Sequence, residues 1–222
     1  MYKLIPAKPI HAKQIIPYLT TTCYWKEFIE GNDLKLPYEE FMLSWVVNAR
    51  LPLTTVLVKE DNEDIIYGCI TTATTAQFGT MPDYTPHVHP RVMEVFGPWF
   101  QYPVSDGVVI ELIAVAKELR GQGYGAKLYQ VAEDLAKKEG KTCLSAFVWS
   151  CFPDSLITFT RRGFMITGCI NLPEPVKMPL LYLEKKPDYL ALKDYFQSQE
   201  YLTTQNMLLP NAAEPYTPRE SF

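Results

Sequence analysis

Three glycines, Gly121, Gly123 and Gly125, occupy alternate positions between a strand-like run and a helix-like run. The whole chain has 11 glycines in 222 residues, so this local concentration is unusual and needs a reason. Glycine loses more backbone entropy on folding than any other residue and packs no side chain. A cluster of glycines therefore indicates either a bare tight turn or a backbone that must wrap closely around an anion.

The segments on either side favour the anion. Residues 107–115, GVVIELIAV, predict a buried strand, and residues 124–139 predict an amphipathic helix that Gly140 ends. The first N–H groups of such a helix have no partner within it and point outward with the positive end of the helix dipole. Glycines let a phosphate approach these groups without a Cβ in the way. A bare turn needs one or two glycines, whereas this loop has three glycines beside Arg120.

Two familiar phosphate-binding motifs do not fit this loop. Gly121-x-Gly123-x-x-Ala126 matches the dinucleotide fingerprint, which also requires an acidic residue about 20 positions later, after the next strand. That strand ends SAFVWS, without an acidic residue. The P-loop pattern fails because Gly-Lys-Ser/Thr is missing.

The remaining segments predict an α/β protein. Apolar and β-branched runs indicate strands, and apolar residues at helical spacing indicate helices, one of them with Asp154 as its N-cap. Residues 76–106 are rich in proline and aromatic residues and form a loop-rich insertion between strands. The predicted strands are 2–7, 53–60, 65–75, 107–115, 141–149, 164–170 and 178–185, and the predicted helices are 9–19, 37–50, 124–139 and 154–163.

Composition excludes several classes of protein. The formal net charge of −4 argues against a nucleic-acid surface. The five cysteines contain no CxxC pair, so neither a disulfide framework nor a metal site is expected. No apolar stretch is long enough to span a membrane, and the first residues lack the apolar core of a signal peptide. We therefore expect a cytoplasmic protein that binds neither nucleic acid nor membrane.

The glycine-rich stretch resembles the acetyl-CoA signature of the GCN5-related N-acetyltransferase (GNAT) family, Arg/Gln-x-x-Gly-x-Gly/Ala after a strand. Here the strand ends Ile113-Ala114-Val115, and Arg120-Gly121-Gln122-Gly123-Tyr124-Gly125 follows at the family's spacing. A later short helix closes in Gly163-Phe164, as in the family. The resemblance covers residues 2–185 and is specific across 107–164.

This resemblance implies a mixed, splayed α/β (α+β) sheet flanked by helices. It implies an acetyltransferase domain over residues 1–186, with the insertion at 76–106, and residues 187–222 then hold a C-terminal helix and a disordered tail. The co-substrate would be acetyl-CoA, with the backbone of Ile113 and Val115 pairing with the pantetheine arm of coenzyme A. Its pyrophosphate would lie on the loop residues Arg120, Gly121, Gln122, Gly123, Tyr124, Gly125 and Ala126.

The catalytic residues match the family less fully than the loop does. Glu111 is the acidic residue within the apolar run 107–115, and some family members carry a glutamate at this place, so Glu111 is the candidate base. It could instead pair structurally with a lysine or arginine. The usual general acid, a tyrosine four residues before Gly-Phe, is replaced here by Phe159.

The acceptor cannot be read from the residues. Trp25, Tyr38 and Trp45 could line an acceptor pocket or could belong to the core. The resemblance implies acetyl transfer to a primary amine of a small molecule or peptide, by direct attack in a ternary complex, in a monomer or homodimer. The alternative is a non-catalytic acyl-CoA-binding sensor or scaffold, in which Phe159 marks the loss of the general acid.

Overall fold

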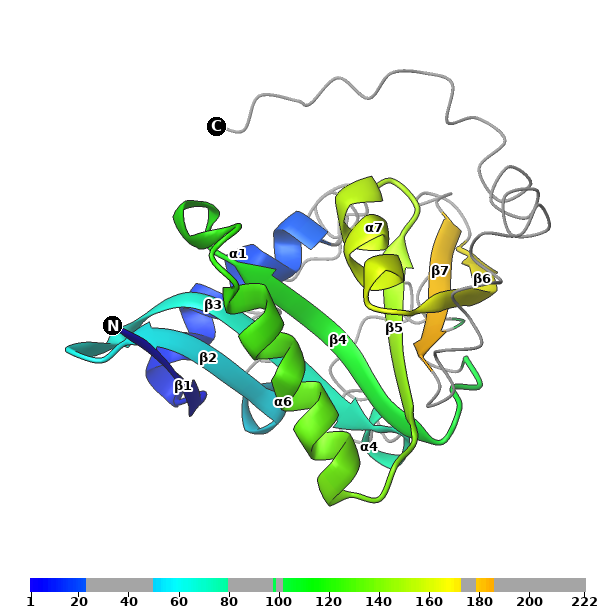
Figure 1. Ribbon diagram of the computed structural model, residues 1–222, viewed down its shortest axis with the longest axis horizontal. Helices are drawn as coiled ribbons and strands as arrows, with labels where there is room; N and C mark the ends of the chain where they lie inside the picture. Colours follow the sequence, from blue (N-terminus) through cyan, green and yellow to red (C-terminus); the bar gives the residue numbers. More distant parts are fainter. Residues whose placement is uncertain (23–49, 80–97, 99–101, 173–178, 186–222) are drawn as a thin grey trace, which may run out of the picture.

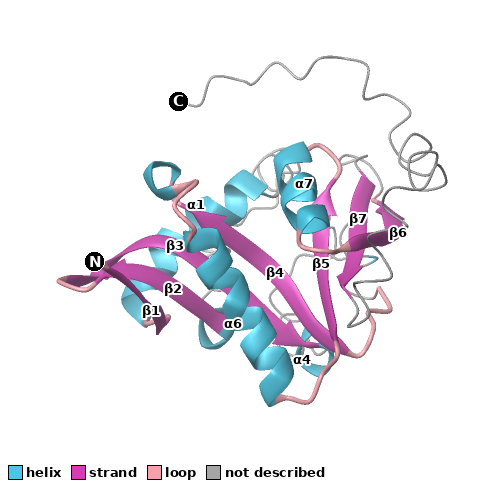
Figure 2. Cartoon of the chain, viewed as in Figure 1, coloured by secondary structure: helices cyan, strands magenta, loops and turns pink. Residues whose placement is uncertain are grey.

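The apolar and β-branched runs of the sequence form one mixed sheet in the computed structural model (Figures 1 and 2). The structure describes residues 1–22, 50–79, 98, 102–172 and 179–185. The strands are β1 (Tyr2–Pro6), β2 (Thr54–Lys59), β3 (Asn62–Thr74), β4 (Gly107–Val115), β5 (Cys143–Trp149), β6 (Met165–Asn171) and β7 (Pro179–Lys185). The α-helices are α1 (Ala12–Thr22), α4 (Thr75–Gly79), α6 (Tyr124–Lys138) and α7 (Pro153–Arg161), with 3-10 turns η1 (Pro9–His11), η3 (Leu51–Leu53) and η4 (Lys117–Leu119).

The described strands form a seven-stranded sheet in the order β1-β2-β3-β4-β5-β7-β6. Neighbouring strands are antiparallel except β4 and β5, which run parallel and are joined through α6. The paired residues of β4 and β5 run from Gly107 with Cys143 to Ile110 with Ala146. Beyond Ile110 the two strands diverge, and Figure 1 shows β4 and β5 separating toward the end of the sheet where α6 begins.

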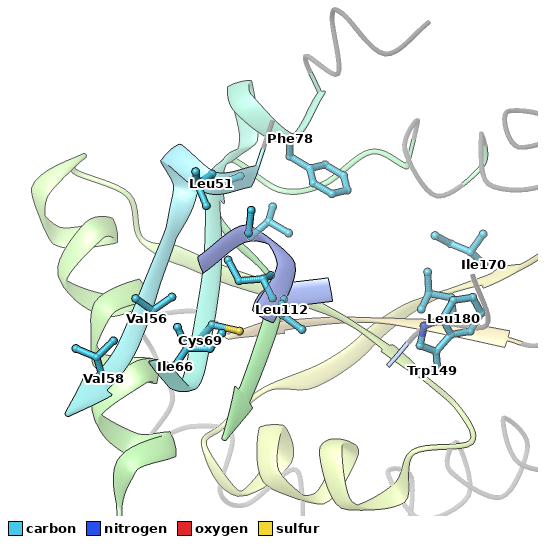
Figure 3. Close-up of a cluster of buried hydrophobic side chains, with 14 of the residues drawn as sticks. Leu51, Val56, Val58, Ile66, Cys69, Phe78, Leu112, Trp149, Ile170 and Leu180 are labelled. Atoms are coloured by element: carbon cyan, nitrogen blue, oxygen red, sulfur yellow. The ribbon is translucent and has the colours of Figure 1, made fainter. Parts of the chain in front are cut away.

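Helices cover both faces of the sheet. One apolar cluster contains Leu128 of α6 and Leu156 of α7, and in Figure 1 both helices lie in front of the sheet. The second cluster contains Ile15 of α1, Leu51 of η3 and Phe78 of α4, on the opposite face. Figure 3 shows this second cluster, including Leu112 of β4 and Trp149 of β5. Strands β4 and β5 therefore contribute to both layers of the core.

A β-bulge interrupts β4 at Glu111. Leu112 pairs with Thr71 of β3 and Ile110 pairs with Thr72, so Glu111 is the extra residue between them. Ile110 packs in the cluster under α6, Leu112 packs in the opposite cluster, and Ile113 returns to the α6 side. A bulge bends its strand and increases the local twist. The bend lies at the residue where β4 leaves β5, which explains why the sheet splays there.

The observed elements match the predicted α/β fold with few differences. Asp154 is not the N-cap of its helix, because α7 begins at Pro153 and Phe152 takes the N-cap position. Proline favours the first position of a helix, where its missing N–H is not needed. The predicted helix 37–50 lies almost wholly outside the described residues, and residues 187–222 lie outside them entirely.

The insertion 76–106 is described at its two ends. Helix α4 occupies its start, and the Oγ1 hydroxyl of Thr75 donates to the carbonyl of Ser105 at 2.8 Å. The same oxygen accepts from the N–H of Gly107, also at 2.8 Å. These two contacts hold both ends of the insertion against the first residue of β4.

The close approach of β4 and β5 at Gly107 predicts a stability effect. A Cβ at Gly107 would lie 2.2 Å from the carbonyl oxygen of Cys143, so one strand would have to move. We expect Gly107→Ala to lower the free energy of unfolding, measured by urea denaturation, by ~1–3 kcal/mol, which is the usual cost of overpacking.

Gly125→Ala provides the control. Its Cβ would meet only the Cγ2 methyl of Val115, at an ordinary 3.9 Å, within helix α6. Replacing a helical glycine by alanine should leave stability unchanged or raise it by about 0.5–1 kcal/mol. Equal unfolding midpoints for wild type and Gly107→Ala would contradict the parallel pairing at this position.

Candidate active site

The glycine-rich loop presents unpaired N–H groups at the start of α6. Gly121 and Gly123 have positive φ values of 77° and 84°, which side chains other than glycine rarely adopt. The N–H groups of Arg120, Gln122 and Ala126 donate to backbone carbonyls of the loop. Within the described part of the chain, the N–H groups of Gly121, Gly123, Tyr124 and Gly125 have no acceptor. They form the type of cradle in which an anion binds at a helix N-terminus.

The side chains of the loop pack around this cradle. Arg120 is exposed, and its Nε donates to the carbonyl of Val115 at 3.2 Å. Gln122 donates through Nε2 to the carbonyl of Glu118 at 2.8 Å. The ring of Tyr124 meets the ring of Tyr2 edge-on, with centroids 5.3 Å apart. The loop is therefore anchored to the end of β4 and to β1.

Beyond the bulge, one edge of β4 has no strand partner among the described residues. The N–H of Ala116 bonds to the carbonyl of Tyr67 on the β3 side. Because polar groups alternate along an antiparallel strand, those of Ile113 and Val115 point to the other side, where β5 has moved away. The carbonyl of Val115 accepts from Arg120, as noted, and the remaining groups can pair with an extended ligand that takes the place of a strand.

A cleft opens where β4 and β5 separate. Its empty volume is about 540 Å³, open solvent included. Its walls come from β4, from β5, from α7 with the turn before it, and from β7. They are apolar except for Glu111 and Ser155, and they comprise Ile110, Glu111, Leu112, Ile113, Phe147, Val148, Trp149, Phe152, Ser155, Phe159 and Leu180.

Glu111 forms a buried ion pair in this cleft. Its Oε2 lies 2.7 Å from Nε of Arg50, which directly precedes η3, and the two side chains are 9% and 6% exposed. Burial raises the pKa of Glu111, and the positive charge of Arg50 opposes that rise. The other oxygen, Oε1, has no hydrogen-bond partner among the described residues. Glu111 thus pairs with an arginine through one oxygen and has a second oxygen without a partner among the described residues.

Phe159 lies in the cleft wall but brings no polar group to it. Its side chain is buried, and its ring packs edge-on against Phe164 with centroids 5.0 Å apart. A tyrosine hydroxyl at this position would add a proton donor beside the apolar walls. Ser155, one turn earlier on α7, is the hydroxyl that the described cleft wall contains.

The structure brings together Glu111, the open edge of β4 and the glycine-rich loop. Sequence reasoning missed Arg50, because its apolar neighbours Val46, Val47 and Leu51 do not indicate which acid it pairs with. A buried arginine nevertheless requires a partner. An arginine among apolar residues is therefore a signal in the sequence that could have indicated a buried ion pair. The predicted acceptor residues Trp25, Tyr38 and Trp45 lie outside the described residues.

The described residues form neither a metal-binding cluster nor a membrane-spanning helix. They contain no group of three or more His, Cys, Asp and Glu side chains placed to hold a metal ion. None of the helices in these same residues has the length and apolar character needed to span a membrane.

Comparison with known proteins identifies similar sequences. The model of the acetyltransferase (GNAT) family matches residues 20–164. The chain is 35% identical over 77 residues to Acetyltransferase Atu2258 of Agrobacterium fabrum. This match covers 35% of the chain and 54% of that relative, so the chain spans about half the relative's length.

Solved structures show the same fold at low sequence identity. An N-acetyltransferase from Staphylococcus aureus Mu50 has a TM-score of 0.55 at 17% identity, over 82% of this chain and 99% of that one. A chain of the NatC complex bound to Gag peptide and CoA has a TM-score of 0.50 at 17% identity, over 83% and 98%. These likenesses show that the splayed sheet with its flanking helices is the acetyltransferase fold.

Proposed function

The chain belongs to the acetyltransferase (GNAT) family, and on that premise we propose that it transfers the acetyl group of acetyl-CoA to a primary amine of a small molecule or peptide. The observation that carries the proposal is the open edge of β4 at Ile113 and Val115, between the glycine-rich loop and the cleft at Glu111. The carboxylate of Glu111 and the free edge follow one another along β4, and the anion cradle lies in the loop after this strand. This is the order that an extended acyl-CoA requires.

The co-substrate would bind along β4. The pyrophosphate of coenzyme A fits the unpaired N–H groups of Gly121, Gly123, Tyr124 and Gly125, with the charge of Arg120 nearby. The amide groups of the pantetheine arm fit the open edge at Ile113 and Val115. The thioester would then reach the apolar part of the cleft beside Glu111.

Glu111 supplies the base that the reaction needs. A lysine-like amine has a pKa of ~10.4, so fewer than about one in a thousand is neutral at pH 7. Glu111 accepts a proton from the ammonium, directly or through one water, and the freed nitrogen attacks the thioester carbonyl in the ternary complex. The C–N bond forms and the C–S bond breaks. Of the two protons the nitrogen loses, one ends on the coenzyme A thiolate and one in solvent.

A second function, a non-catalytic acyl-CoA-binding sensor or scaffold, is favoured by Phe159. This residue stands in the cleft wall where the family's usual acid would be, and it has no hydroxyl. A missing acid does not by itself abolish transfer, because a thiol of pKa ~8.5 is a tolerable leaving group. The loss of one acid typically costs ~10²- to 10⁴-fold in rate. We therefore keep the enzyme as the first proposal.

The test that separates these functions is the release of free thiol from acetyl-CoA across a panel of amines. The panel contains polyamines, aralkylamines, amino acids, aminoglycosides and short peptides with free N-termini. Amine-dependent thiol release with a matching acetylated product supports the enzyme. Binding of coenzyme A by calorimetry, without transfer to any of these amines, supports the sensor.

The loop assignment predicts a loss of affinity in Gly123→Val. A β-branched residue does not readily adopt φ of 84°, so the cradle would rearrange. We expect the Kd for coenzyme A, measured by calorimetry, to rise at least about ten-fold, which corresponds to ~1.4 kcal/mol.

Gly140→Val is the matched control for this variant. Gly140 also has positive φ, 63°, and also faces open space, but it lies just beyond the other end of α6. It should lose stability in the same way and keep wild-type affinity for coenzyme A. An unchanged Kd in folded Gly123→Val would show that the pyrophosphate does not bind at this loop.

The base assignment predicts the effect of Glu111→Gln. We expect kcat/KM for the amine to fall at least ~100-fold, the size of a general-base contribution, with little change in coenzyme A affinity. The acidic limb of the pH–rate profile should flatten, because the carboxyl that titrates there is gone. Full activity in this variant would make Glu111 a structural partner of Arg50.

The missing hydroxyl predicts a gain in Phe159→Tyr. The new hydroxyl would enter the cleft wall, where it could protonate the departing thiolate. We expect kcat to rise several-fold, which is less than the ~10²- to 10⁴-fold effect of a fully positioned acid. Phe164→Tyr, a change in the adjoining ring outside the cleft wall, is the control. An unchanged kcat in Phe159→Tyr would show that proton delivery does not limit the rate.

A further inference from the structure

Arg50 is held in the cleft from two directions. Its side chain meets Oε2 of Glu111 at 2.7 Å, as described above. Its carbonyl accepts a 2.7 Å hydrogen bond from the Oγ1 hydroxyl of Thr54, and this hydroxyl lies 2.8 Å from that of Thr71. Thr71 pairs with Leu112, the residue after the bulge. The contacts form a closed ring from Arg50 through two threonines to the bulge and back through Glu111.

The arginine and the two threonines of this ring are buried. Thr54 and Thr71 are 3% and 2% exposed, and Arg50 is 5% exposed. Hydrogen bonds between buried groups hold their partners in one geometry, because breaking them would leave polar atoms unsatisfied. The hydrogen bonds therefore hold the backbone of Arg50 against β3, and the 2.7 Å ion pair places its guanidinium beside Oε2 of Glu111.

The two oxygens of Glu111 have different surroundings. Oε2 is next to Arg50, whereas Oε1 is buried and has no hydrogen-bond partner among the described residues. An unsatisfied buried oxygen destabilises the folded state, so proteins rarely leave one without a role. Glu111 is also part of the cleft wall. Oε1 is thus the oxygen of this wall residue that no described group pairs with.

We propose that Arg50 is a positioning residue for acetyl transfer: it orients Glu111 through Oε2, keeps the carboxylate ionised and leaves Oε1 to accept the proton of the acceptor amine. This inference rests on the proposed function, because it assigns Arg50 a role in that reaction. No new covalent step is involved, since the proton moves from the ammonium nitrogen to Oε1 and from there to solvent.

The electrostatics of the cleft explain why a base at this place needs a cation. The neighbours of Glu111 along β4, Ile110 and Leu112, are buried apolar residues, and an unpaired carboxylate among them would take up a proton. Burial raises the pKa of Glu111, and Arg50 is the charged group that the described residues place against it. A cation that opposes this rise keeps the base deprotonated at lower pH.

The experiment compares pH profiles of kcat/KM for wild type, Arg50→Met and Arg50→Lys with the best amine from the panel. In Arg50→Met the carboxylate loses its counter-charge, so the acidic limb should move to higher pH by at least about one unit. At pH values on the acidic limb, kcat/KM should fall at least ten-fold below the wild-type value, and it should recover as the pH rises. The KM for acetyl-CoA should stay within two-fold of wild type.

Two further variants separate positioning from a general structural effect. Arg162→Met removes an arginine that packs over the ring of Tyr129, outside the cleft wall. This variant should keep the acidic limb of the pH profile at its wild-type position. Arg50→Lys keeps the charge but not the planar guanidinium. We expect the acidic limb of Arg50→Lys to stay within about half a pH unit of the wild-type limb. The plateau value of kcat should fall at least ten-fold, because Glu111 is less well oriented. If Arg50→Met does not fold, Arg50→Lys decides the question.

A measurement that needs no activity keeps this inference separate from the proposed function. In protein with ¹³C-labelled glutamate, the carboxyl signal assigned to Glu111 by its loss in Glu111→Gln should titrate at higher pH in Arg50→Met than in wild type. An unchanged titration overturns the inference. So does an equal loss of kcat/KM at every pH, or an unchanged plateau kcat in Arg50→Lys. If wild type acetylates no amine while the titration shifts, the proposed function fails and the electrostatic role of Arg50 stands.

Discussion

The architecture of the site depends on the β-bulge at Glu111. A regular strand would continue to pair with β3 on one side and with β5 on the other, and no polar group of β4 would be free. The extra residue bends β4 at the position where its pairing with β5 ends, while the pairing with β3 resumes at Leu112. As a result, β4 stays anchored in the sheet by one neighbour and exposes its other edge. The cleft, the free edge and the glycine-rich loop then follow one another along a single strand and the turn after it.

The buried pair of Arg50 and Glu111 is better explained by chemistry than by stability. Moving two charges out of water costs several kcal/mol per ion, and their attraction repays this only with good geometry, so apolar residues would often serve the fold as well. Here the pair lies in the wall of a cleft whose other residues are largely apolar, and one carboxylate oxygen has no described partner. Carboxylates with a pKa raised by burial, next to one specific cation, are common at functional sites. The two threonines behind Arg50 make this arrangement rigid.

The elements that the sequence predicted well are those whose signals are local. The apolar runs that became β2, β3, β4, β5 and β7 have the composition of buried strands, and the apolar spacing across residues 124–139 matches α6. The one wrong prediction at a helix end is also local: the sequence predicts Asp154 as an N-cap, although Pro153 occupies the first helical position. Glu111 is a candidate base because a carboxylate in an apolar strand needs a reason, and the sequence allows both a catalytic role and a structural pairing. The structure shows that Glu111 pairs with Arg50 and that its Oε1 has no hydrogen-bond partner among the described residues, and the role of Glu111 as a base stays a proposal.

The sequence by itself determined the strand–loop–helix unit at residues 107–139 and its glycines, because backbone conformation and apolar periodicity are properties of neighbouring residues. The left-handed φ values of Gly121 and Gly123 are of this kind. Only the tertiary structure decided that β4 bulges at Glu111, that it parts from β5 after Ile110, and that Arg50 faces Glu111. These features depend on the register between segments far apart in the chain. No local pattern encodes that register, since it results from packing the two layers of the core on both faces of the sheet at once.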